Sequence, residues 1–349
     1  MTPREERALA GTRRHFLQQS QLGLGALALT AFQGPHASAA VPAASNPLAP
    51  RQPPLPARAK RVIYIELAGA PPQQELFDYK PELVKRNMEP CPDELLQGQR
   101  FAFIKGHPKL LGTPYKFIQQ GSAGTWMSEL LPHLGTVADD LTVIRSMHTD
   151  QFNHAPADLY MFTGNPRFGS ASMGSWITYG LGTENADLPG FVVLISGGSD
   201  PTGGKSCWGS GFLPSVFQGV QCRSSGDPIL YVGDPPGMKR ATRRRSLDAL
   251  QKLNQGELNQ FGDPETATRI SQYELAFRMQ TEIPETIDLA GEPQHIQAAY
   301  GLDQKETRAF GSRCLLARRL VERGVRFVQI WAGGWDSHDD VAGGHRKAA

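Results

Sequence analysis

Asp336 and His338 are the residues of this chain whose types and spacing most directly indicate chemistry. They lie one residue apart, directly after an apolar run that ends in Gly333 and Gly334. The glycines allow the backbone to turn sharply, and a carboxylate oxygen beside an imidazole nitrogen suits zinc or a similar divalent ion. The pattern predicts either a pair of metal ligands or a solvated loop. Because the pair follows a predicted strand, we weigh the two interpretations equally.

A second polar segment, residues 148–158, contains His148, Thr149 and His154. Two histidines within so short a span could coordinate a metal ion or move protons. Pro156 can begin a helix, and His154 would then lie near a helix N-terminus, where the dipole favours an anion such as sulfate or phosphate. Two hydrogen-bonded loop histidines are an equal alternative.

The elements that must position these residues alternate between apolar runs and helical patterns. Strands are predicted at 61–69, 141–147, 191–198, 228–233 and 325–334, and helices at 128–140, 243–283 and 307–324. Near-continuous Val, Ile and Leu content indicates strands buried on both faces, so we expect an α/β fold with a mostly parallel central sheet and helices on both faces. Ligands of such folds bind beyond the carboxyl ends of the strands. The loops holding Asp336, His154, Glu75 and Asp78 all follow predicted strands.

Composition sets broad limits on the class of protein. The chain has 349 residues, 40% of them hydrophobic, which is enough for one large α/β domain or two small ones. Its net charge of +2 gives no reason to expect a nucleic-acid partner, and the basic run 239–245 is interpreted as a solvated helix face. Among the four cysteines, Cys207 and Cys222 are close enough in sequence to pair, but free thiols are as plausible, and no spacing resembles a zinc site.

The first 40 residues resemble a twin-arginine signal peptide. Arg13 and Arg14 precede a Phe-Leu pair and an apolar stretch at 22–32, and small residues at 37–40 suit a signal peptidase. The stretch is too short for a stable membrane span. We therefore expect export to the periplasm or cell envelope, with a Pro/Ala-rich linker at 41–60, extended or disordered, and a folded domain at 61–349.

Several segments resemble the domain-of-unknown-function 1501 family, exported bacterial proteins grouped by similarity with alkaline phosphatases and sulfatases. They include "FDYKPEL", "LLGTPYKF", "VIRSMHTD", "MGSWITYGLGTEN", "WGSGFLPSVFQGV" and "GWDSH". The resemblance implies a divalent metal centre, zinc or calcium-like, that hydrolyses sulfate or phosphate esters. The metal ligands it implies are Asp336, His338, Glu75 and Asp78. It places His154, with Thr149 nearby, where sulfatases have their nucleophile.

The chain departs from this pattern at three places. The sulfatase Cys or Ser and its Arg are absent around His154, and Gln73, Gln74 and Glu75 stand where the family usually has His and Asp. The resemblance also implies further strands and ligands past Ala349, so residues 341–349 are interpreted as a tail of little structural information. The expectation is a truncated, sulfatase-like hydrolase that is inactive alone. The alternative is a non-catalytic cell-envelope protein that binds or assembles with another envelope protein.

Overall fold

The computed structural model of the chain divides into two compact units. It describes residues 46–349 except 54, 70, 99–103, 197–199, 224–228, 230–232, 236 and 262. Of these described residues, those at 46–65 and 155–330 form the first unit, and those at 66–154 and 331–349 form the second. The predicted signal peptide lies outside the described residues, and so does most of the strand predicted at 228–233.

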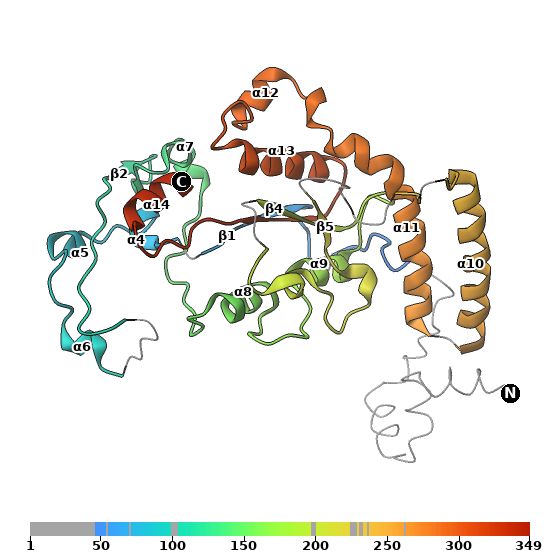
Figure 1. Ribbon diagram of the computed structural model, residues 1–349, viewed down its shortest axis with the longest axis horizontal. Helices are drawn as coiled ribbons and strands as arrows, with labels where there is room; N and C mark the ends of the chain where they lie inside the picture. The colour runs from blue at the N-terminus through green and yellow to red at the C-terminus, as the bar shows by residue number, and fades with distance from the viewer. Residues whose placement is uncertain are drawn as a thin grey trace, which may run out of the picture. The chain divides into compact units, whose positions relative to one another are not determined.

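A four-stranded sheet in the order β1-β6-β4-β5 forms the centre of the α/β fold (Figure 1). Its strands are β1 (Val62–Leu67), β4 (Phe191–Ser196), β5 (Val220–Cys222) and β6 (Phe327–Ala332). β4 and β5 pair in parallel. The Val62 N–H donates to the Arg326 carbonyl, and the Ala68 N–H donates to the Ala332 carbonyl, with the same separation along the chain, so β1 and β6 also run in one direction. The predicted α/β class and mostly parallel sheet are confirmed.

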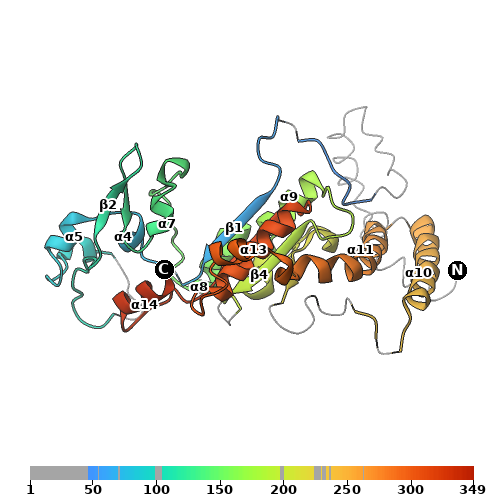
Figure 2. The ribbon, with the colours of Figure 1, turned by 90° about the horizontal axis from the view of Figure 1, so that it is seen from above.

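Helices cover both faces of this sheet. Figure 1 shows α13 (Arg308–Glu322) on one face, with α8 (His154–Thr163) and α9 (Met173–Leu181) on the other, and Figure 2 shows α13 running over β4. Leu316 and Leu320 of α13 are buried in one cluster with Val328 and Ile330 of β6. Burial of each such side chain contributes about 1.5–3 kcal/mol. This apolar contact is what holds the last predicted helix against the last predicted strand.

The link between α13 and β6 is a tight helix end. The Gly324 N–H donates to the Val321 carbonyl, and the Val325 N–H donates to the Leu320 carbonyl, at 3.1 and 3.0 Å. Gly324 has φ +94°, a conformation that glycine adopts without steric cost. This is the Schellman arrangement, with Gly324 as the glycine that ends the helix.

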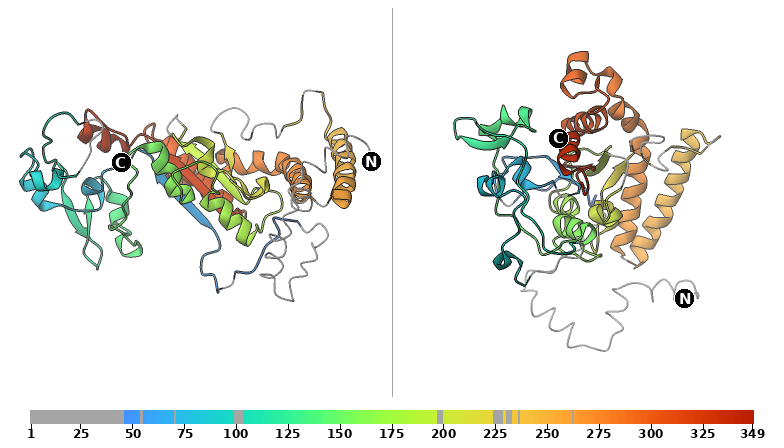
Figure 3. Two further views of the ribbon diagram at one scale, coloured as in Figure 1. Left: turned by 90° about the horizontal axis from the view of Figure 1, so that it is seen from below. Right: turned by 60° about the vertical axis from the view of Figure 1, so that its left-hand side comes forward.

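The predicted helical stretch 243–283 forms two helices, α10 (Arg240–Phe261) and α11 (Pro264–Ile287), which lie side by side (Figure 3). α11 begins where the Asp263 carboxylate accepts the Glu265 N–H at 3.0 Å. The basic run 239–245 is only partly the solvated face that we predicted, because Arg244 bonds the Glu274 carboxylate at 2.6 and 3.0 Å and lies over the Phe277 ring. Its charge is therefore used to join the two helices.

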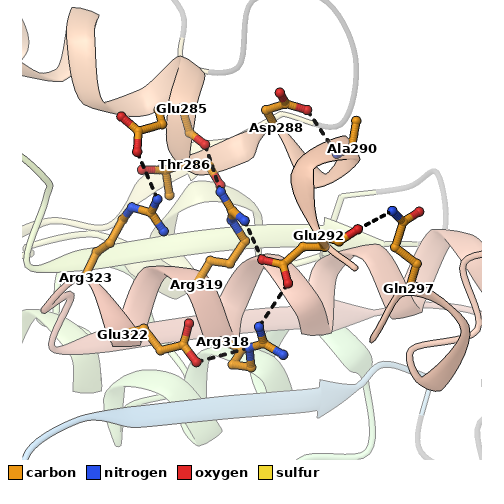
Figure 4. A network of polar contacts seen from close by, with 10 residues as sticks. All are labelled: Glu285, Thr286, Asp288, Ala290, Glu292, Gln297, Arg318, Arg319, Glu322 and Arg323. Carbon is orange, nitrogen blue, oxygen red and sulfur yellow. Dashed lines mark hydrogen bonds and ion pairs between the residues drawn. The ribbon is translucent and has the colours of Figure 1, made fainter. Parts of the chain in front are cut away.

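A polar network joins α13 to the end of α11 and the following turn η4 (Leu289–Gly291) (Figure 4). The Arg319 guanidinium donates to the Thr286 and Glu285 carbonyls, each at 2.9 Å, and also bonds the Glu292 carboxylate. Arg318 bonds the second oxygen of Glu292 at 3.1 Å. The side-chain hydrogen bond from Arg319 lowers the pKa of Glu292 below its ordinary value of 4.5. The network satisfies backbone carbonyls at the end of α11 that no helical N–H can reach.

Part of the predicted linker packs on the first unit. Leu48 is buried in a cluster with Val216 and Phe217, and its carbonyl accepts the Thr183 N–H at 2.9 Å. The Arg51 N–H donates to the Leu181 carbonyl at the end of α9. Apolar and backbone contacts thus hold residues 48–51 in place, although their composition is typical of a spacer.

The second unit contains a hairpin and short helices. The hairpin pairs β2 (Phe117–Gln120) with β3 (Thr125–Ser128), and the helices are α4 (Gln73–Leu76), α5 (Pro81–Lys85), α6 (Asp93–Leu96), α7 (Pro132–Gly135), η1 (Ala138–Asp140) and α14 (Val341–Ala348). The strand predicted at 141–147 is wrong. Leu141, Ile144 and Met147 are exposed there, so this apolar run has no buried sheet position to occupy. The helix predicted at 128–140 reduces to α7 and η1.

None of the four cysteines, all within the described residues, forms a disulfide, and Cys207 and Cys222 are buried. Burial raises the pKa of the Cys222 thiol to about 11. Across the described part of the chain, no helix combines the length and apolar character that crossing a membrane requires.

Candidate functional site

The loop that presents Asp336 is fixed by close backbone packing within the second unit. The Trp335 N–H donates to the Ala68 carbonyl at 3.1 Å, and the Trp335 side chain is buried. Gly69 has φ +106°, and a Cβ built on it would overlap the backbone nitrogen of Asp336. The turn after β1 and the loop after β6 therefore pack backbone against backbone, which only glycine at position 69 permits.

Asp336 lies between two histidines. One carboxylate oxygen, Oδ2, is 3.3 Å from Nε2 of His154, and the other, Oδ1, is 2.8 Å from Nε2 of His338. The side chains of His154, Asp336 and His338 are 43%, 47% and 78% exposed, so the group is open to solvent. Three residues singled out from the sequence, drawn from two loops far apart in the chain, thus meet in one group.

Three further residues singled out from the sequence, Glu75, Asp78 and Thr149, have different partners. Glu75 is buried and contacts His345, with 2.5 Å between Oε2 and Nδ1. The Asp78 carboxylate pairs with Lys80 at 2.6 Å. Thr149 is exposed, and its hydroxyl accepts the Gln151 N–H at 3.1 Å in a local turn. Among the described residues, no hydrogen bond or ion pair joins these three side chains directly to Asp336, His154 or His338.

His345 is the residue that sequence reasoning missed. The interpretation of 341–349 as an uninformative tail is wrong, because residues 341–348 form α14, capped by the Asp340 carboxylate accepting the Gly343 N–H at 3.0 Å. A Cβ at Gly343 or Gly344 would displace the Asp340 carboxylate or the Ser337 hydroxyl. An Asp directly before a run without proline was the available signal for this helix start.

The Asp336 group is a set of close carboxylate–imidazole contacts rather than a finished metal cage. Over the described residues, no group of three or more His, Cys, Asp or Glu side chains is arranged to hold a metal ion. The donor types nevertheless suit a zinc-like ion. Ligand bonds of about 2.0–2.1 Å in a tetrahedral site place neighbouring donor atoms about 3.3 Å apart. The 3.3 Å between His154 and Asp336 matches this spacing, and His338, at 2.8 Å, is exposed enough to adjust.

Comparison with known proteins supports the family resemblance alone. A family model described as "Protein of unknown function (DUF1501)" matches residues 59–349. No curated protein and no solved structure matches the chain. The grouping with alkaline phosphatases and sulfatases, and the continuation past Ala349, stay predictions.

Proposed function

The chain belongs to the DUF1501 family of proteins of unknown function, and we propose that its Asp336 group binds a divalent cation at the centre of a sulfate or phosphate ester hydrolase. The observation behind this proposal is the carboxylate of Asp336 with an imidazole nitrogen at each of its oxygens. Nitrogen and oxygen donors of this kind are typical of catalytic zinc sites, which keep one position open for water or substrate.

The roles of the three side chains follow from their placement. Asp336 holds the central position between the Nε2 atoms of the two imidazoles, and its backbone is fixed by the packing of Gly69. His154 is the first residue of α8, whose N-terminal N–H groups favour an approaching anion such as a sulfate or phosphate group. A bound divalent cation supplies polarisation of the ester oxygens and a more acidic bound water.

His338 has the greatest freedom of the three because its side chain is 78% exposed. It can rotate to contact a cation or an ester oxygen without disturbing packed neighbours. Thr149 lies five residues before His154 on the same loop and is proposed as a contact for the substrate. Glu75 and Asp78, engaged with His345 and Lys80, are weaker proposals as ligands.

We place this activity in the periplasm or cell envelope, because the predicted twin-arginine signal exports folded proteins. No nucleic-acid partner is proposed. The substrate class follows from the family resemblance and from the accessible position of the group, and not from a pocket shape.

The test is cobalt(II) titration of the full-length chain, followed by visible absorption, with zinc competition. Wild type is compared with Asp336→Asn, His154→Gln and His338→Gln. We expect a cobalt spectrum in wild type and its loss in Asp336→Asn, because the central carboxylate would be gone. His107→Gln is the matched control, since His107 lies 3.9 Å from Asp93 in another His–Asp pair of the second unit that has no second histidine.

Hydrolysis of aryl sulfate and aryl phosphate is measured in the same samples. Cobalt binding lost in the site variants but kept in His107→Gln, together with turnover, supports the hydrolase. A folded wild-type chain with no site-dependent cobalt binding and no turnover rejects it and favours the alternative, a non-catalytic envelope binding or assembly protein.

A further inference from the structure

The second unit contains a carboxylate–imidazole pair that solvent does not reach. The Glu75 and His345 side chains are 2% and 4% exposed, and Oε2 of Glu75 lies 2.5 Å from Nδ1 of His345. Glu75 comes from α4, just after β1, whereas His345 comes from α14 near the other end of the chain. Because both side chains are enclosed by protein, they can act on Asp336 through the residues packed around them.

A short series of contacts leads from this pair to Asp336. The His345 ring stacks on the buried Trp335 ring, with 6.4 Å between ring centroids and 28° between planes. Trp335 directly precedes Asp336, and its N–H is held by the Ala68 carbonyl. The backbone at Asp336 is thus tied to Ala68 on one side and, through Trp335, to His345 on the other.

The same helix closes the other end of the loop. Asp340 caps α14, and the Ser337 side chain lies against Gly344. The Tyr115 hydroxyl donates to the Ala342 carbonyl, which fastens the start of α14 to the second unit. Both ends of the loop 335–340 therefore contact α14: Trp335 stacks on His345, and Asp340 caps the start of the helix. The buried His345 side chain anchors α14 in the second unit.

We infer that Glu75 and His345 are positioning residues that hold α14 and thereby set the place of Asp336 between its two histidines. An imidazole held by a buried carboxylate has one orientation, so the Trp335 ring that stacks on it has one position as well. Without Glu75 the buried imidazole has no hydrogen-bond partner, and an unsatisfied polar group inside a protein lowers its stability. The His345 ring is then free to move, and the loop 335–340 is no longer fixed by its contact with that ring. This inference rests on the proposed function only where cobalt is used to report on Asp336.

The experiment uses the full-length chain with Glu75→Ala, Glu75→Gln and the control Asp139→Ala. Asp139 also accepts hydrogen bonds in the second unit, from the Ser122 and Ala123 N–H groups of the hairpin loop, but it does not touch α14 in any described contact. Two quantities are measured: hydrogen exchange of the backbone amides at 335–340, and cobalt(II) affinity.

In Glu75→Ala we expect exchange at 335–340 to accelerate about tenfold or more and cobalt affinity to fall about 10–100-fold, as for other residues that support metal ligands. Glu75→Gln keeps an oxygen acceptor, so it should retain much of the slow exchange at 335–340 and much of the cobalt affinity of wild type. Asp139→Ala should change neither, although it loosens the hairpin. A merely structural role for Glu75 would lower stability without changing cobalt affinity in the folded protein.

Unchanged exchange at 335–340 in folded Glu75→Ala overturns the inference, whether or not cobalt binds. Absence of cobalt binding in wild type rejects the proposed function instead, and exchange then decides the positioning role alone. If Glu75→Ala does not fold, the double variant Glu75→Leu/His345→Leu removes both polar partners while keeping the site apolar. Wild-type exchange at 335–340 in that variant would equally overturn the inference.

Discussion

Substitution of Gly69 by Ala tests the packing on which the Asp336 group depends. An ideal Cβ at Gly69 would overlap the Asp336 backbone nitrogen and lie 2.7 Å from the Trp335 carbonyl carbon. Gly334 provides a matched control on the same loop. Its φ is +103° against +106° for Gly69, but no heavy atom outside its chain neighbours lies within 4 Å of its ideal Cβ. The two substitutions therefore share backbone strain and differ in crowding.

The expected magnitudes follow from these two contributions. A non-glycine residue at such a φ costs about 1–3 kcal/mol of unfolding free energy. Crowding at Gly69 adds about 1–3 kcal/mol, since the atoms it meets belong to the backbone and cannot rotate away. Gly334→Ala should then lose about 1–3 kcal/mol, and Gly69→Ala about 2–6 kcal/mol. Because both residues are in the second unit, the loss of unfolding free energy should be detected first in the amides of that unit.

The assay is urea unfolding of the full-length chain combined with native-state hydrogen exchange. Exchange is needed because a chain of two units need not unfold in one step. Amides at 66–69 and 331–336 report on the packed loops, and cobalt binding reports on Asp336. Equal losses in Gly69→Ala and Gly334→Ala would refute the close approach of the Gly69 turn to the Asp336 loop.

Three further outcomes are expected. Arg319→Ala should cost about 1–3 kcal/mol in urea unfolding, because the Thr286 and Glu285 carbonyls and the Glu292 carboxylate lose a charged donor. Arg323→Ala, whose partner carboxylate is exposed, should cost about 0–1 kcal/mol, and similar losses in the two variants would count against the network in Figure 4. The Ser122 and Ala123 N–H groups lower the pKa of Asp139 below its ordinary 3.8, so its stabilisation is present above that pH and is lost as pH falls through the lower, folded value. Acid titration of the second unit followed by exchange should show this loss in wild type and not in Asp139→Asn. With a pKa of about 11, only about a thousandth of Cys222 is thiolate at pH 8, so iodoacetamide should modify it after unfolding and not before.

Local pattern predicted the central sheet best where a run is buried on both faces. The runs at 191–198 and 325–334 form β4 and β6, which are buried on both faces, because such residues are stable only in the middle of a layered fold. The run at 61–69 also forms a strand, β1, but β1 lies at the edge of the sheet with Val62, Ile63 and Ile65 exposed, so its predicted burial on both faces is wrong. The same criterion failed at 141–147, where the apolar residues are exposed. An apolar run indicates that burial of its side chains is favourable, but it does not show that the fold provides a buried sheet position for them.

The candidate site was predictable to the extent that it depends on strand ends. Asp336 and His338 were found because polar residues after buried strands of a parallel sheet tend to meet. His154 was placed at the same edge through the strand predicted at 141–147, which does not form, yet His154 lies 3.3 Å from Asp336. Glu75 follows the same rule, yet its partner is His345, a residue 270 positions away that no local pattern connects to it. The rule places residues on loops but does not give the direction of each side chain.

The amino-acid sequence by itself determined the family, the α/β class and the residues able to do chemistry, because these depend on residue type and short-range periodicity. Tertiary structure alone decided which of them meet. Asp336 joins two histidines while Glu75 is buried against His345, since the backbone packing of Gly69 and the docking of α14 are contacts between segments distant in the chain. Such contacts depend on the complete packing of the unit, and that is why residue spacing could not reveal them.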